Sequence, residues 1–194
     1  NGIKMYDVLT GFKYIAEIIR LQEGKEKFIG GGEESYGYLG ADFVRDKDAV
    51  TTCCMIAEAA AWAACAGKTL TCLLDDIYGK YGYYAEDLLS ITKKGMNGQQ
   101  EIADMMKTFR ENPPEEICGS PVTMIKDYKL RVSKDMETGA ESAIDLPVSD
   151  VLQFFTQDGS KVTVRPSGTE PKIKFYFSVI MAQSGTQVAE AARE

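Results

Sequence analysis

The sequence predicts an α/β segment with a mixed sheet and helices, followed by an α+β domain with an antiparallel sheet and one or two helices. Apolar residues recur at helical spacing through much of the first 80 residues. Beyond Tyr81-Gly82 the pattern changes to short alternating strands around a helical stretch. Asp158-Gly159, between two apolar runs, is a strong hairpin signal. We therefore predict a first domain over 1–80 and a second domain over 81–194.

Three helices are predicted in the first domain. Ile15, Ile18 and Ile19 share one face of a helix over 12–21. Asp48 is a typical helix N-cap, and the helix it begins is expected to end at Gly67. A further helix is predicted from Thr69 to Gly79, and its apolar stripe consists of Leu70, Leu73, Leu74 and Ile77. A brief strand is expected at 28–29, immediately before three glycines.

The second domain is predicted to consist mainly of strands. A helix over 99–110 should end at Pro113-Pro114, because proline cannot continue a helix. Strands are predicted at 85–91, 122–125, 130–132, 151–155, 161–165 and 172–180. A last helix is expected at 186–194. Short strands joined by turns indicate an antiparallel sheet.

Composition excludes several classes of function. A net charge of −7 argues against a nucleic-acid surface, and no apolar run is long enough to predict a membrane span. The chain has no histidine, which excludes a Ser-His-Asp triad or a phosphohistidine within it. The odd cysteine count, without a C-x-x-C pair, indicates neither a disulfide framework nor a zinc site. Four cysteines (Cys53, Cys54, Cys65 and Cys72) lie in segments predicted as buried helix, so we expect packed, reduced thiols in a cytoplasmic protein.

A glycine-rich loop over 30–37 contains two glutamates and a serine. The three consecutive glycines are expected to allow positive φ and a close approach of the backbone to a ligand. Carboxylates beside a hydroxyl suit the recognition of vicinal sugar hydroxyls, because a carboxylate accepts two hydrogen bonds. An ordinary turn with solvated glutamates explains the same spacing equally well.

A second loop, over 165–172, joins two predicted strands. Arg165 offers a planar fork of donors that matches phosphate oxygens, and Ser167 and Thr169 add hydroxyls. Gly168 is expected to free backbone N–H groups for an anion nest, and Lys172 and Lys174 add positive charge. A solvated hairpin accounts for the glycine but not for this convergence, so anion binding is favoured. Lys47, which precedes a helix, is by itself better explained as part of a solvated charged turn.

These segments resemble those of α-D-phosphohexomutases, the phosphoglucomutase/phosphomannomutase family. The sequence Gly32-Glu33-Glu34-Ser35-Tyr36-Gly37 resembles the sugar-binding loop of the family's third domain, and Arg165-Pro166-Ser167-Gly168-Thr169 resembles the phosphate-binding loop of the fourth. Thr10-Gly11 resembles the loop that faces the sugar. Lys47 falls where glucose-type members place a substrate-contacting lysine. The resemblance places the end of domain 3 in 1–80 and domain 4 in 81–194.

The resemblance implies a role for each of these residues. Substrate binding is assigned to Thr10, Gly11, Glu33, Ser35 and Lys47. Binding of the phosphate that is not transferred is assigned to Arg165, Ser167, Gly168, Thr169 and Lys174. Lys174 stands where many members have arginine, and Tyr36-Gly37 departs from the Gly-His of phosphomannomutase-type members.

No catalytic or metal-ligating residue is predicted in this chain. The family's phosphoserine motif and its Asp-x-Asp-x-Asp magnesium loop are not present in the sequence, and the family carries them in its first two domains. The resemblance therefore implies a C-terminal part of a phosphohexomutase that moves phosphate between C1 and C6 of a hexose. Mg²⁺, a sugar 1,6-bisphosphate, a hexose phosphate and the N-terminal domains are the expected cofactors and partners. A phosphosugar-binding module without mutase activity and a plain structural domain stay open, as do glucose, mannose, pentose and glucosamine phosphates.

Overall fold

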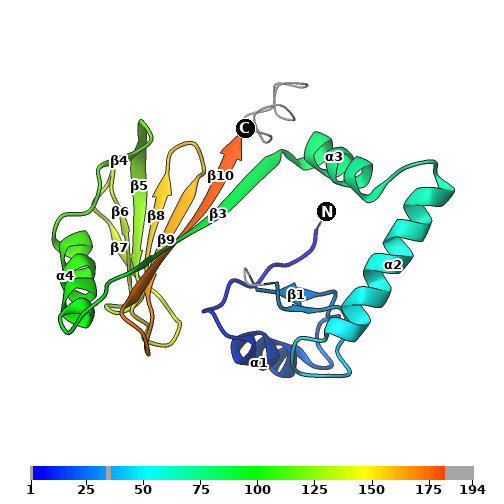
Figure 1. The fold of residues 1–194 in the computed structure, drawn as a ribbon, viewed down its shortest axis with the longest axis horizontal. Helices are drawn as coiled ribbons and strands as arrows, with labels where there is room; N and C mark the ends of the chain where they lie inside the picture. The colour runs from blue at the N-terminus through cyan, green and yellow to red at the C-terminus, as the bar shows by residue number, and fades with distance from the viewer. Residues whose placement is uncertain (1, 34–35, 182–194) are drawn as a thin grey trace. The chain divides into compact units, whose positions relative to one another are not determined.

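The computed structural model describes residues 2–33 and 36–181, which form two compact units, 1–76 and 77–194. The units divide between Asp76 and Ile77, a few residues before the boundary expected near residue 80. The predicted fold class is confirmed, with helices and short strands in the first unit and an antiparallel sheet with one long helix in the second (Figure 1). The helix expected at 186–194 lies outside the described residues.

The first unit consists of helices around a small pair of strands. Its elements are α1 (Phe12–Gln22), β1 (Gly31–Gly32), β2 (Tyr38–Leu39) and α2 (Ala49–Cys65), and α3 (Leu70–Tyr81) continues from it into the second unit. The two strands are antiparallel, with Gly31 opposite Leu39. A small core of Phe12, Ile19 and Leu39 forms where α1 packs beside these strands.

The strand expected at 28–29 was placed too early, because the ladder forms at the glycines themselves. None of Gly30, Gly31 and Gly32 has a positive φ, so the expectation of positive φ at these glycines was wrong. They are needed for close packing: a Cβ on Gly30 would lie 2.5 Å from the Tyr38 hydroxyl, and one on Gly31 would lie 2.9 Å from Ile15 Cγ2. Glycine here allows side chains of the same unit to approach the backbone.

The prediction that the helical cysteines are buried was wrong. All five cysteines are exposed, and Ala63 is the buried residue of α2. Composition misled the prediction because α2 is apolar on all sides, a property that usually belongs to a helix buried on all sides. Within the described residues α2 packs beside β2, and this leaves Val50, Ile56 and Trp62 exposed. The predicted stripe of α3 is likewise not covered, since α3 has no buried residue.

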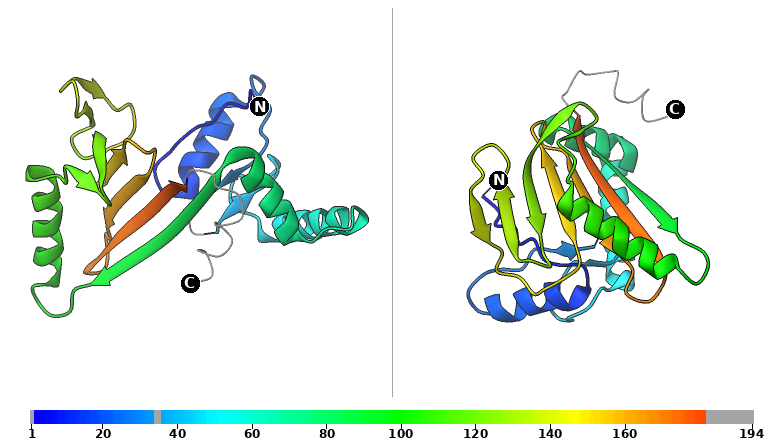
Figure 2. Two further views of the ribbon diagram at one scale, coloured as in Figure 1. Left: turned by 90° about the horizontal axis from the view of Figure 1, so that it is seen from above. Right: turned by 90° about the vertical axis from the view of Figure 1, so that its left-hand side faces the viewer.

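The second unit is one twisted antiparallel sheet with a helix on one face (Figure 2). Its elements are β3 (Tyr83–Thr92), α4 (Gly98–Glu111), β4 (Glu116–Ile117), β5 (Ser120–Asp127), β6 (Val132–Asp135), β7 (Glu141–Ala143), β8 (Leu152–Thr156), β9 (Lys161–Pro166) and β10 (Lys172–Met181). The strand order is β3-β10-β9-β8-β5-β6-β7, and β4 pairs with β5. The long strand β10 therefore lies between β3 and β9 in the sheet. Of these two strands, β9 immediately precedes β10 in sequence, and β3 lies far from it in sequence.

Helix α4 closes the core of this unit. Its amphipathic sequence directs Ile102 and Met106 against the sheet, where both are almost fully buried. From the sheet side the core is formed by Val122, Leu152, Phe154, Val162, Val164 and Ile173. The buried residues alternate along β8 and β9, as expected for strands with one covered face. The uncovered face is the one that bears Arg165 and Lys174.

Among the described residues no single helix is long and apolar enough to cross a membrane. Only α2 and α3 taken together reach that length and composition, and they are bent by 87° where they join.

Candidate functional site

The first predicted site forms around a contact between two segments that are distant in sequence. The backbone N–H of Gly11 donates to Glu33 Oε1 at 3.1 Å. Gly11 precedes α1, with a φ of 125° that side chains rarely adopt, and Glu33 follows β1. The hydrogen bond fixes the Glu33 carboxylate at the start of α1. The structure therefore brings together the two loops predicted to bind sugar hydroxyls.

The side chain of Lys47 lies near Glu33, beside Gly37. A Cβ on Gly37 would lie 2.8 Å from Glu33 Oε2 and 3.0 Å from Lys47 Cδ, so both side chains flank this glycine. The ammonium of Lys47 is 5.5 Å from the centre of the Phe12 ring, a cation–π distance. Gly11, Glu33 and Lys47 thus form one cluster, in which the Glu33 carboxylate and the stem of Lys47 flank Gly37. The Lys47 ammonium itself pairs with Asp46 at 3.3 Å. A carboxylate acceptor and an ammonium donor in one cluster can bind sugar hydroxyls.

The remaining predicted residues of this site differ in what the structure shows. Thr10 is exposed and adjoins the Gly11 contact. Ser35 lies outside the described residues.

The sequence did not single out the cationic groove beside this cluster. Its polar lining includes Lys13, Arg20, Arg45 and Lys47, together with the carboxylates of Glu17 and Asp46. Helical spacing could have revealed part of it, because residues 13, 17 and 20 fall on one face of α1. Three of the four cations are paired, Arg20 with Glu17, Arg45 with Glu23 and Lys47 with Asp46. Lys13 has no such ion pair within the described residues, so the groove carries a small local excess of positive charge.

The two carboxylates that flank Lys47, those of Asp46 and Asp48, form hydrogen bonds within the turn and at the start of α2. Asp48 caps α2 by accepting from the N–H groups of Val50 and Thr51, and it also accepts from the Thr51 hydroxyl. The hydrogen bond from this hydroxyl, together with those from the backbone, lowers the pKa of Asp48. Asp46 accepts from the backbone N–H of Lys47 at 2.8 Å. Asp48 thus forms the expected cap, and Asp46 bonds to Lys47, from whose ammonium it also accepts at 3.3 Å.

The second predicted site is the turn between β9 and β10. Ser167 Oγ accepts from the backbone N–H groups of Thr169 and Glu170, at 3.4 and 3.3 Å. The N–H of Ser167 donates to the carbonyl of Lys172 at 2.7 Å. These bonds shape the turn and leave the Ser167 hydroxyl proton available to an acceptor. Gly168 is exposed, lacks a positive φ, and a Cβ there would meet nothing within 4 Å, so the protein itself does not require glycine at this position.

Two cations lie opposite each other next to this turn. Lys174 of β10 is the direct register partner of Arg165 of β9, and both are half-buried. Like charges directly opposite each other across a ladder destabilise a sheet. Within the described residues no carboxylate lies at ion-pair distance from either side chain, whereas Lys172 pairs with Glu170 at 2.9 Å. An anion bound between them would relieve their repulsion.

A cleft of about 370 Å³ lies beside the turn, toward α4. Its polar lining includes Gln99, Ser149, Asp150, Arg165 and Ser167. Asp150 accepts a hydrogen bond from Arg110, whose Nε also donates to Asp127 at 2.8 Å. Burial disfavours the charged Arg110, but the hydrogen bonds to Asp127 and Asp150 outweigh it and raise its pKa. No sequence signal indicated this network, because Arg110, Asp127 and Asp150 lie far apart in the chain.

No group of three metal-ligating side chains occurs in 2–33 and 36–181. These described residues therefore do not fit a magnesium site.

Comparison with known proteins shows the family of this chain. Residues 1–81 match the sequence profile of phosphoglucomutase/phosphomannomutase, alpha/beta/alpha domain III. Residues 122–194 match that of the phosphoglucomutase/phosphomannomutase C-terminal domain. The chain belongs to the phosphoglucomutase/phosphomannomutase family. The resemblance seen in the loop sequences is confirmed.

Individual relatives support the same family. The chain is 41% identical over 179 residues to phosphoglucomutases of Staphylococcus aureus strains MRSA252 and bovine RF122 / ET3-1. This match covers 92% of the chain but 32% of each relative, so the chain spans about a third of their length. In fold it resembles the open form of the Paramecium phosphoglucomutase pp63/parafusin, with a TM-score of 0.64 and 19% identity, over 100% of this chain and 33% of that one.

Proposed function

We propose that this chain is the sugar- and phosphate-binding part of a phosphohexomutase, which moves a phosphoryl group between C1 and C6 of a hexose phosphate. The register pair Arg165–Lys174 carries the proposal, since it places two cations side by side without a carboxylate partner in the described residues. The printed names of the relatives, phosphoglucomutase, support the same reaction class. The Arg165 loop holds the phosphate that is not transferred.

The mechanism assigned to this chain is positioning. Arg165 presents a bidentate fork to the phosphate, Lys174 adds charge, and the hydroxyls of Ser167 and Thr169 donate to remaining oxygens. Glu33, held by the N–H of Gly11, accepts from the sugar hydroxyls beside Lys47. A fixed sugar presents its other end to the transfer chemistry, and such orientation accounts for a large share of many enzymatic rate enhancements.

A hexose bisphosphate carries a phosphate at each end, so it can bind to these residues in two orientations. Either of its phosphates can occupy the Arg165 loop, so the same residues serve both halves of a reaction in which the intermediate reorients. The phosphoserine and the Mg²⁺, which neutralises developing charge at the transferred phosphate, belong to other domains of the parent protein in this proposal. The isolated chain should accordingly bind phosphosugar without turning over glucose 1-phosphate.

The decisive test compares wild type with Arg165→Lys in the full-length parent protein. The lysine keeps the charge but loses the fork, so we expect phosphosugar affinity to fall by about 10- to 100-fold. Arg131→Lys is the matched control, because Arg131 is an exposed arginine of the same unit that donates to the carbonyl of Ile144. Equal affinities in wild type and Arg165→Lys would contradict the phosphate assignment.

Glu33 provides a second, independent test. Glu33→Ala should lower kcat/KM by about 10- to 1000-fold, through lost hydroxyl contacts and poorer alignment. Because Glu33 also anchors the Gly11 loop, Glu33→Gln is the sharper variant: its amide oxygen can still accept from Gly11. Wild-type kinetics in both variants would remove Glu33 from the site. Binding without turnover by the full-length parent would instead favour a non-catalytic phosphosugar-binding module.

A further inference from the structure

Three non-glycine residues of the described chain have a positive φ: Tyr36, Cys118 and Arg131. Cys118, with Gly119, forms the two-residue turn between β4 and β5, where φ values of 51° and 79° suit a type I′ turn. Arg131 follows β5, and its Nε donates to the carbonyl of Ile144 at 3.1 Å. Local structure therefore accounts for two of the three.

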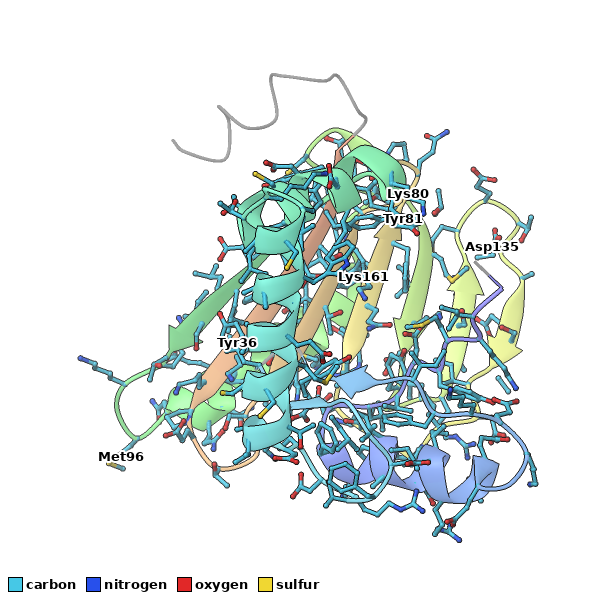
Figure 3. All side chains as sticks on the ribbon, turned by 90° about the vertical axis from the view of Figure 1, so that its right-hand side faces the viewer. Tyr36, Lys80, Tyr81, Met96, Asp135 and Lys161 are labelled. Atoms are coloured by element: carbon cyan, nitrogen blue, oxygen red, sulfur yellow. The ribbon has the colours of Figure 1, made fainter. Side chains whose placement is uncertain are left out.

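Tyr36, labelled in Figure 3, is different, because its side chain is not packed within the described residues. Its φ is 68°, a region that is unfavourable for an ordinary side chain and that glycine or asparagine adopts more readily. Its side chain is 99% exposed, so the ring gains no burial in return. An unfavourable backbone conformation that holds a large exposed aromatic ring points to a role outside the protein's own packing.

The surroundings of Tyr36 show what the ring can meet. The loop is closed by a hydrogen bond from the Glu33 N–H to the Gly37 carbonyl, at 2.8 Å. Gly37, the next residue, is flanked by the side chains of Glu33 and Lys47. Tyr36 is thus fixed at the edge of the cluster assigned to the sugar hydroxyls. It is the one fully exposed aromatic ring among the described residues of that loop.

We propose that Tyr36 contacts the substrate, and that its ring packs against the C–H face of the hexose bound by Glu33 and Lys47. A pyranose directs hydroxyls outward from its edge and presents C–H groups on its faces. An aromatic ring covers such a face, while a carboxylate and an ammonium bind the hydroxyls. This inference rests on the proposed function and adds an apolar contact to it. A ligand without a sugar ring, such as inorganic phosphate, gains nothing from Tyr36.

The test uses the full-length parent protein in four forms: wild type, Tyr36→Phe, Tyr36→Gly and Cys118→Gly. Tyr36→Phe keeps the ring and should keep kcat/KM for glucose 1-phosphate within about 2-fold. Tyr36→Gly removes the ring and should raise KM by about 3- to 10-fold, the worth of one aromatic contact. Inhibition by inorganic phosphate should be unchanged in both. Cys118→Gly relieves a positive φ in the other unit and should leave all kinetic constants unchanged.

Thermal stability separates a ligand contact from a structural role. Glycine suits a positive φ, so Tyr36→Gly should leave the Tm unchanged or higher while sugar binding weakens. A lower Tm with an unchanged KM would show that Tyr36 packs against another part of the parent protein, and would overturn the inference. So would equal KM values in wild type and Tyr36→Gly.

Failure of the proposed function has a different outcome. If the wild-type parent does not turn over glucose 1-phosphate, the mutase proposal falls, and titration with glucose 6-phosphate then decides the role of Tyr36. Weaker binding by Tyr36→Gly than by Tyr36→Phe supports the contact. Equal binding, or no binding by wild type, overturns it.

Discussion

Both units of this chain contain helices with apolar side chains, but the two units bury those side chains to different extents. In 77–194, α4 and the sheet bury a continuous core that includes Met106, Leu152 and Phe154. In 1–76 the hydrophobic cluster of the described residues has three buried members, and most apolar side chains of α2 are exposed. The difference lies in the partners available, since α4 has a whole sheet to pack on and α2 lies beside a two-residue strand. Apolar content predicts the tendency to be buried, and the neighbouring elements decide whether burial occurs.

The largest expected effect is a difference in autonomous folding. The fragment 77–194 should unfold cooperatively, because it contains its own core. The fragment 1–76 should show no cooperative thermal transition and should bind a hydrophobic dye, because α2 exposes apolar side chains. Circular dichroism melts and dye fluorescence measure both. A sharp transition in 1–76 would show that the small core is sufficient.

Single substitutions compare a buried aromatic residue of the second unit with an exposed one of the first. Phe154 is 1% exposed, so Phe154→Ala should cost about 3–5 kcal/mol of unfolding free energy through lost burial and the resulting cavity. Trp62 is 65% exposed despite its size, and Trp62→Ala should change the stability of this chain little. Denaturant unfolding of both variants measures the contrast. Similar losses would mean that Trp62 is covered in solution.

Ion pairs of the two units should differ in the same direction. Arg110 pairs with Asp127 at 2.8 Å, and their side chains are 16% and 11% exposed. Arg110→Met leaves Asp127 without its partner and should cost about 2–3 kcal/mol. In the first unit, Lys4 pairs with Glu26 at the same distance, but the side chains are 62% and 37% exposed. Lys4→Met should have no measurable effect on chemical denaturation, because exposed pairs contribute little. Equal losses would show that solvent exposure does not separate these pairs.

The smallest effect concerns the cap of α2. Hydrogen bonds, the one from the Thr51 side chain first, hold the pKa of Asp48 below its ordinary value of 3.8. A carboxylate with a lowered pKa in the folded state stabilises the fold above the unfolded pKa and loses that contribution as the pH falls through the folded pKa. Asp48→Ala should therefore lower the Tm near pH 7, and the difference from wild type should shrink as the pH falls below 3.8 and through the lowered pKa of the folded state. A difference independent of pH would show that the charge of Asp48 is not involved.

Local signals in the sequence determined much of this protein. The cap at Asp48, the helical spacing in 12–22 and 98–111, and the Asp158-Gly159 turn are each encoded within a few residues, so the helices and the β8–β9 hairpin could be predicted. The family is carried by loop motifs that are equally local. The roles of Thr10, Ser35 and the other residues of those motifs remain predictions from the resemblance.

The tertiary structure decided what depends on neighbours distant in sequence. Gly11 meets Glu33 across 22 positions, and Lys174 is placed opposite Arg165 only by the register of β10 on β9. β10 also pairs with β3, so that Lys174 lies opposite Ser90 on its other side. The exposure of the cysteines and of Trp62 depended in the same way on what packs against α2. Local propensity is a property of short segments, whereas burial, register and the pairing of charges are properties of the surfaces that the folded chain brings together.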